Sequence, residues 1–240
     1  INFETYQALN GAFVAANENS TVRCIVFTGR GRSFCSGDDV VEIMASSGGL
    51  SSTLNTQKDN QPASPTPAVV TAMRASRCPI INAVNGAAVG FGMELSLLCD
   101  IRIASDSARF SEMFIRRGII ATSISFDLLP GIVGPAIAAE MLLTGRHISA
   151  KEAKKYGLIG HIVPKGKALE KAIELAQMIE KNSPVSIKAI MTSLRDLEGF
   201  SESEALEKEL ELGWPVFESE DAKEGLSAFA EKRKPIFKGK

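Results

Sequence analysis

The sequence predicts an α/β protein whose strands pair in parallel, followed by a helical C-terminal region. Three observations predict this class. Short apolar runs that suit buried strands alternate with amphipathic helical segments over residues 1–164. Glycine-containing turns close two of those strands and open the helices that follow. From Lys165 onward the periodicity is helical. We therefore expect a core over 1–164 and a helical region over 165–240.

Composition limits the class of protein. The 240 residues include 27 basic and 28 acidic side chains, a net charge of −1, and 45% are apolar. This apolar share supports one large domain, and the near-neutral charge disfavours a nucleic-acid surface. No apolar run reaches the ~20 residues of a membrane-spanning helix, and we find no secretory signal. Four cysteines without a CxxC pair are typical of free thiols in a reducing compartment. We expect a cytoplasmic protein without a metal site, a nucleic-acid partner or a membrane partner.

The first elements follow from periodicity. Apolar side chains at helical spacing predict an N-terminal helix with Asn2 as its N-cap: Phe3, Tyr6, Leu9, Ala12 and Phe13. A strand is expected over 22–28, and a turn over 34–39 leads into a short helix. Residues 46–67 lose all periodicity and carry clusters of Ser, Gly and Pro. We expect a mobile loop there, long enough to be a lid or a specificity segment.

The rest of the core alternates in the same way. A helix over about 67–76 precedes a buried strand over 79–84, and a glycine-rich turn over 85–92 opens a helix that runs to about Cys99. Further strands are expected over 101–104, 108–111 and 158–163. Further helices are expected over 123–130, 134–143, 149–156, 166–182, 184–198, 201–212 and 219–232.

Two of the turns share a geometry that suits an anion. One runs over Ser33–Asp39 and the other over Asn85–Glu94, and each follows a strand and opens a helix. A helix N-terminus offers unpaired N–H groups and a positive dipole end, and glycine allows the backbone to approach a ligand closely. If the turns face each other, they form an oxyanion hole with two donors. If they lie apart, they are two tight turns between strand and helix.

Glu94 is a candidate general acid/base. It lies about one turn into an otherwise apolar helix, beside the second glycine-rich turn. Desolvation there would raise the pKa of its carboxyl group toward neutrality. The alternative is a first-turn glutamate that complements the helix dipole.

Five stretches resemble the crotonase superfamily, that is, the enoyl-CoA hydratase/isomerase family. They are Gly29–Asp39, Ala83–Leu95, Cys99–Ala104, Leu143–Ala150 and Ala228–Lys238, in the family's order across the chain. The resemblance implies a crotonase-type spiral core of repeated ββα turns, with a C-terminal helical region that mediates trimer contacts. It also implies a homotrimer or homohexamer. The family's first hairpin, which would precede Ile1, is absent from this sequence.

The resemblance further implies an acyl-CoA thioester substrate whose enolate is stabilised by two backbone N–H groups. Carried over by position, the donors are the N–H of Asp38, after Gly37, and the N–H of Phe91, after Gly90. No resident cofactor is implied, since coenzyme A is part of the substrate. Glu94 then falls on the first catalytic glutamate of the family.

The position of the family's second catalytic glutamate carries Phe114 here. Glu112 lies two residues earlier and would need a local shift to serve. This departure favours chemistry with a single base, such as moving a double bond, over a mechanism in which two carboxylates hold one water. Asp127 is a third candidate acid, on a predicted helix away from the motif.

The resemblance also implies the contacts to coenzyme A. Arg32 would approach its phosphates, Ser36 its adenine, and Phe229 and Lys232 would reach the coenzyme A of a neighbouring subunit. Thioester hydrolysis and decarboxylation remain open, because a fold does not determine a reaction. A member that binds acyl-CoA without catalysis also remains open: the phenylalanines near the site favour it, and the retained Glu94 opposes it.

Overall fold

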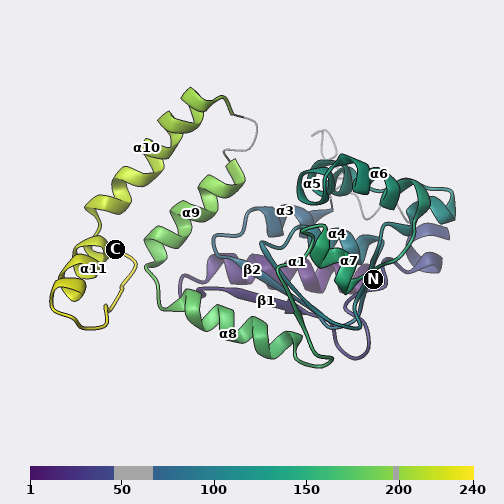
Figure 1. Ribbon diagram of the computed structural model, residues 1–240, viewed down its shortest axis with the longest axis horizontal. Coiled ribbons are helices and arrows are strands. Elements are labelled where there is room, and N and C mark those ends of the chain that lie inside the picture. The colour runs from purple at the N-terminus through teal and green to yellow at the C-terminus, as the bar shows by residue number, and fades with distance from the viewer. Residues whose placement is uncertain (46–66, 197–199) are drawn as a thin grey trace.

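A computed structural model of the chain describes residues 1–45, 67–196 and 200–240 (Figure 1). Residues 46–66 of the expected loop lie outside this description, so the lid is not tested.

The strands form two sheets. The first is parallel throughout and has the order β1-β2-β4-β7, which confirms the predicted parallel pairing. Its strands are β1 (Ile25–Thr28), β2 (Ile80–Val84), β4 (Ile101–Ser105) and β7 (His161–Val163). The second has the order β3-β5-β6, with β3 (Ala87–Val89), β5 (Arg109–Ser111) and β6 (Ile148–Ser149). β3 pairs with β5 in parallel, and β5 pairs with β6 antiparallel.

Helices surround both sheets. Around the strands lie α1 (Phe3–Glu18), the π-helical turn η1 (Val40–Ala45), α3 (Ala68–Arg74), α4 (Phe91–Leu97), the 3₁₀ turn η2 (Met113–Arg117), α5 (Ser123–Val133), α6 (Pro135–Thr144) and α7 (Ala150–Lys155). After β7 the chain forms α8 (Ala168–Glu180), α9 (Pro184–Asp196), α10 (Glu202–Glu218) and α11 (Glu220–Ala230). As expected, the Asn2 side chain caps α1 by accepting from the Thr5 N–H.

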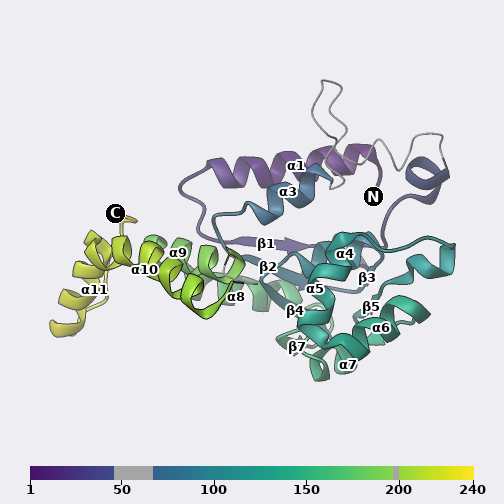
Figure 2. The same ribbon diagram turned by 90° about the horizontal axis from the view of Figure 1, so that it is seen from above.

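The four-stranded sheet is buried on both faces. Ile81 and Ala83 of β2 and Ile103 of β4 pack against α8 on one face. Ile80 and Val84, which alternate with them along β2, join the main core together with residues of α1 and α3. Figure 2 shows α1 and α3 side by side beyond β1. Because helices cover both faces, the central strand β2 is buried at every position rather than at alternate ones.

The C-terminal helices extend away from the sheets. In both views α10 and α11 form an arm at the opposite end of the molecule from β3 and α4 (Figures 1 and 2). α10 begins with a capping box between Ser201 and Glu204, and none of its side chains is buried. None of the described helices is long and apolar enough to cross a membrane.

β3 and α10 are among the elements whose bounds differ from the sequence-based expectation. Ala87–Val89, expected to be part of a turn, forms β3, because its backbone pairs with β5 on one side and bridges to Cys35 on the other. Both partners are distant in sequence, so no local pattern reveals the strand. α10 continues to Glu218 rather than ending near residue 212, and it contains Pro215.

Candidate active site

The two glycine turns lie against each other. The Cys35 N–H donates to the Ala87 carbonyl at 3.0 Å, and the Val89 N–H donates back to the Cys35 carbonyl at 2.9 Å. A methyl group added to Gly37 would lie 3.0 Å from the Val89 carbonyl oxygen and 3.7 Å from the Phe91 nitrogen. Gly37 and Gly90 have φ angles of 95° and 55°, a region that favours glycine. The facing arrangement is therefore the one that the structure adopts.

The backbone N–H groups of Asp38 and Phe91 make no hydrogen bond within the described residues. Both residues line a cavity of about 70 Å³, together with Ser36, Phe114 and other side chains from η1, β3 and η2. The Phe114 ring closes one wall of this cavity, since its Cζ would lie 3.8 Å from a methyl group on Gly90. Two free donors at one cavity can stabilise an oxyanion.

Glu94 is completely buried in the first turn of α4, the helix that begins at Phe91. Its Oε1 accepts three hydrogen bonds: from the Thr122 N–H at 2.8 Å, the Thr122 hydroxyl at 2.9 Å and the Ser125 hydroxyl at 2.9 Å. Its Oε2 is buried without a partner among the described residues. One carboxyl oxygen of Glu94 is thus held in place, and the other can bind a proton or a water molecule.

Glu112 lies beside Glu94. It is 1% exposed, and neither of its carboxyl oxygens has a hydrogen-bond partner in the described part of the chain. The negative charge of Glu94 raises the pKa of Glu112. The Ser125 hydroxyl, which donates to Glu94, lowers the pKa of Glu112. The backbone at Glu112, with φ −92° and ψ 62°, ends β5 and begins the 3₁₀ turn η2.

Burial makes both carboxyl groups weak acids. Desolvation raises the pKa of Glu94 to about 7, against the opposing effect of its hydrogen bonds from Thr122 and Ser125. Desolvation, and then repulsion by Glu94, raise the pKa of Glu112 to about 8. Such a pair titrates as a unit and shares one proton near neutral pH. The pair leaves three carboxyl oxygens able to bind a proton or a water molecule.

Tyr6 connects the two turns from outside the cavity, although the sequence pattern indicates only an apolar helix position. Its hydroxyl donates to Asp38 Oδ1 at 2.8 Å, and its ring lies 5.1 Å from the Phe91 ring between centroids. Burial raises the pKa of Asp38, and the Tyr6 hydrogen bond offsets part of that rise. One side chain of α1 therefore contacts both cavity residues whose N–H groups make no hydrogen bond within the described residues.

The other expected site residues are dispersed. Arg32 is exposed, and its carbonyl oxygen lies in close contact with Gly86 at the edge of the second turn. Phe229 is 87% exposed at the end of α11, and Lys232 follows it; within one chain neither approaches the cavity (Figure 2). Asp127 forms an exposed ion pair with Arg74 at 2.6 Å and lies outside the Glu94 cluster.

Three polar residues that sequence reasoning missed complete the site: Tyr6, Thr122 and Ser125. The signal for Thr122 was present, because a threonine directly before a predicted helix is a common N-cap. It caps α5 by accepting from the Ile124 N–H. Its second role, as a donor to Glu94, depends on the packing of α5 against α4.

Comparisons with known proteins agree with this geometry. Residues 1–240 match the sequence pattern of the enoyl-CoA hydratase/isomerase family. The chain is 37% identical to enoyl-CoA hydratase EchA19 of Mycobacterium tuberculosis, over 100% of the chain and 88% of that protein. It is 34% identical to the 2,3-dehydroadipyl-CoA hydratase of Escherichia coli, over 98% and 88% respectively. The crystal structure of enoyl-CoA hydratase from Bacillus anthracis superposes with a TM-score of 0.88 at 31% identity, covering 100% of this chain and 90% of that one.

Proposed function

Because the chain belongs to the enoyl-CoA hydratase/isomerase family of the crotonase superfamily, and is thus a crotonase-type acyl-CoA enzyme, we propose that it adds water across the double bond of a 2-enoyl-CoA thioester. The observation that supports hydration is the buried pair of Glu94 and Glu112 with its three unpartnered oxygens. A site that only moves a proton needs one carboxylate, whereas hydration must hold a water molecule and a proton together.

The two N–H groups stabilise the charge that develops in the reaction. The thioester oxygen accepts hydrogen bonds from the N–H groups of Asp38 and Phe91, which are free for this purpose. As water adds to C3, negative charge moves from the double bond onto that oxygen and forms an enolate. One donor of this kind contributes about 3 kcal/mol to the stabilisation of the transition state.

The carboxyl pair carries the protons. Glu94, whose Oε1 is held by three donors, is the carboxylate that takes a proton from water while the water oxygen bonds to C3. Glu112, which lacks the three donors that hold Glu94, is the acid that delivers its proton to C2. One water is consumed and one 3-hydroxyacyl-CoA forms, and the proton now on Glu94 restores the pair by transfer to Glu112.

Substrate binding and assembly follow the same proposal. Coenzyme A enters as part of the substrate, with Arg32 and Ser36 at its polar end and Phe114 beside the acyl group. Phe229 and Lys232 serve a neighbouring subunit, which agrees with their distance from the cavity of their own chain. The chain then works as a homotrimer or homohexamer.

Isomerisation of a 3-enoyl-CoA is the second candidate, and Phe114 favours it. The phenyl ring lines the cavity beside Gly90, where a carboxylate would be expected to hold water. In this case Glu94 alone would remove a proton from C2 and return it to C4.

Substitution of each glutamate separates the two reactions. We expect Glu94→Gln to lower the kcat of crotonyl-CoA hydration by about 10²–10⁴, while binding of the unreactive butyryl-CoA is retained. Glu112→Gln should lower hydration to a similar extent. If isomerisation is the true activity, Glu112→Gln instead spares the conversion of 3-hexenoyl-CoA. Asp127→Asn, an exposed carboxylate on α5, is the matched control and should leave both rates unchanged. Unchanged turnover in Glu94→Gln would remove Glu94 from the mechanism.

A further inference from the structure

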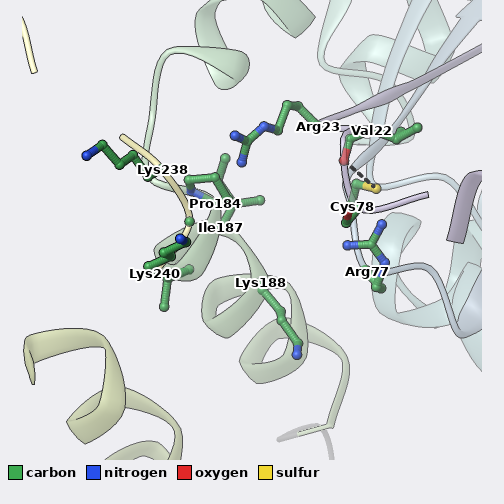
Figure 3. Close-up of a pocket in the computed structure, with 12 residues that line it drawn as sticks. Val22, Arg23, Arg77, Cys78, Pro184, Ile187, Lys188, Lys238 and Lys240 are labelled. Atoms are coloured by element: carbon green, nitrogen blue, oxygen red, sulfur yellow. Dashed lines mark hydrogen bonds between the residues drawn. The ribbon is translucent and has the colours of Figure 1, made fainter. Parts of the chain in front are cut away.

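A second cavity lies at the opposite end of the parallel sheet from the glycine turns. It has a volume of about 470 Å³ and lies between the starts of β1 and β2, the beginning of α9 and the C-terminal tail (Figure 3). The glycine turns follow the carboxyl ends of the same two strands. At 3.3 Å per residue, the length of β2 alone separates the two regions by about 15 Å.

The lining of this cavity is strongly basic. Among the described residues, five cationic side chains line it from four separate segments and no acidic side chain does; the five are Arg23, Arg77, Lys188, Lys238 and Lys240. None of them takes part in an ion pair within the described residues. In a chain with 27 basic and 28 acidic residues, such a concentration of unpaired positive charge raises the local potential.

One of these cations is held in place by hydrogen bonds. Arg77 donates from Nε to the Asn17 carbonyl at 2.5 Å and from Nη2 to the Asn19 carbonyl at 2.7 Å, so neutral oxygens hold its guanidinium without cancelling its charge. Figure 3 shows Arg23 pointing from the strand side toward the tail and Arg77 beside Cys78, while Lys188 on α9 points away from Arg23. Lys238 directs its ammonium group away from this space in the same view.

The opposite wall is held in place by a buried carboxylate. Asp221, which is 2% exposed, accepts from the Lys238 N–H at 2.7 Å, from the Gly239 N–H and from the Ser183 hydroxyl at 2.8 Å. These hydrogen bonds hold residues 238–239 of the C-terminal tail next to the start of α9. Asp221 does not line the cavity, and its charge is already satisfied by three donors, so it leaves the lining cations available.

We propose that this cavity binds a small ligand that carries a phosphate or pyrophosphate group, at a site separate from the acyl-CoA substrate. Guanidinium and ammonium groups that line one cavity from different segments suit the several oxygens of such an anion. The volume lies within the range of small-molecule sites. The five cationic side chains favour a phosphate-rich ligand over an acyl chain, which carries no negative charge.

Inorganic pyrophosphate is the probe. Binding to the full chain is measured by calorimetry, with and without saturating butyryl-CoA. We expect one site per chain, with an affinity that butyryl-CoA leaves unchanged and that falls with added salt. The double variant Arg23→Gln/Lys188→Gln should bind about tenfold more weakly or worse, since it removes two charged donors. Neither side chain makes a hydrogen bond within the described residues, so folding should be retained.

The control variant removes two positive charges from a different part of the surface. Lys151→Gln/Lys155→Gln changes two exposed lysines of α7 and should bind pyrophosphate as the unaltered protein does. Equal weakening in the control would mean nonspecific attraction and would overturn the proposal. Displacement of pyrophosphate by butyryl-CoA would assign the anion to the substrate site. Absence of binding, with a sedimentation coefficient that changes in the Arg23/Lys188 variant, would mean that the basic face contacts another copy of the chain.

Discussion

At the residue scale, the site depends on where two carboxyl groups are placed. Three donors hold one oxygen of Glu94, whereas among the described residues only the Ser125 hydroxyl lies near enough to Glu112 to lower its pKa. This asymmetry separates their roles, because hydrogen bonds to the charged form favour a carboxylate and desolvation with fewer donors favours the acid. The pair is therefore prepared to hold one proton on Glu112 before the substrate arrives.

The same asymmetry predicts how stability depends on pH. The pKa of Glu112 is raised to about 8 in the folded chain, from 4.5 for an ordinary glutamate. Between these values the folded state keeps a proton that the unfolded state has lost, so the free energy of unfolding decreases as pH rises from about 4.5 to 8. Glu112→Gln removes this titration. In urea unfolding over this pH range, the free energy of unfolding of the variant should rise by several kcal/mol relative to that of the unaltered protein. Parallel curves for the two proteins would contradict a buried, proton-holding Glu112.

Sequence reasoning found Glu94 and both glycine turns because each depends on a local motif. It could not place Glu112, because counting along the motif identified Phe114 as the residue in register. The orientation of Glu112 depends on the backbone at the junction of β5 and η2 and on the packing of α5, which brings Ser125 to both carboxyl groups. Such contacts join segments that are distant in sequence. Tyr6 was missed for the same reason.

At the element scale, the cavity is formed by one helix start and two turns that pack backbone to backbone. Gly92, in α4, shows how closely they approach. A methyl group added there would lie 2.4 Å from the Cys35 carbonyl oxygen and 2.6 Å from the Cys35 Cβ. Gly11, also inside a helix, has no heavy atom of the described residues within 4 Å of the equivalent point. Close packing therefore requires glycine at position 92, whereas the described residues leave room for a side chain at position 11.

The two alanine substitutions should change stability in opposite directions. Gly11→Ala should stabilise the chain by about 0.5–1 kcal/mol, because alanine loses less backbone freedom in a helix. Gly92→Ala should destabilise it by about 1–3 kcal/mol through overpacking, and it should lower turnover by moving the first turn away from Phe91. Chemical denaturation measures both effects. A Gly92→Ala protein with full stability and activity would show that the turns are not tightly packed.

Element boundaries illustrate the limit of local patterns. The parallel strands β1, β2 and β4 and the helices α5 to α9 were predicted close to their observed positions, because apolar runs and caps mark them. β3 was hidden in a glycine-rich turn, since three small residues carry no strand signal of their own. Only its pairing with β5 and the bridge to Cys35 define it.

At the scale of the whole molecule, the predicted crotonase-type α/β class is confirmed, and the C-terminal arm is the part that a single chain leaves exposed. The α10 side chains Leu206, Leu210, Trp214 and Phe217 repeat at helical spacing and are 57–76% exposed. Apolar faces of this kind usually mark an interface.

Assembly through this face can be tested directly. Trp214→Glu should shift the protein from an oligomer to a monomer in sedimentation velocity, because it places a charge in the apolar face of α10. Trp214→Phe preserves the apolar contact and should preserve assembly. An unaltered protein that sediments as a monomer would contradict the proposed trimer or hexamer.

The central claim is that the Glu94–Glu112 pair holds a water molecule next to the two N–H donors. Incubation with crotonyl-CoA and 3-hexenoyl-CoA in deuterated water, with products identified by mass spectrometry, tests it most directly. We expect crotonyl-CoA to give the 3-hydroxy ester with one deuterium at C2. Migration of the 3-hexenoyl double bond without any hydration of crotonyl-CoA would contradict the claim and leave Glu94 as a single base.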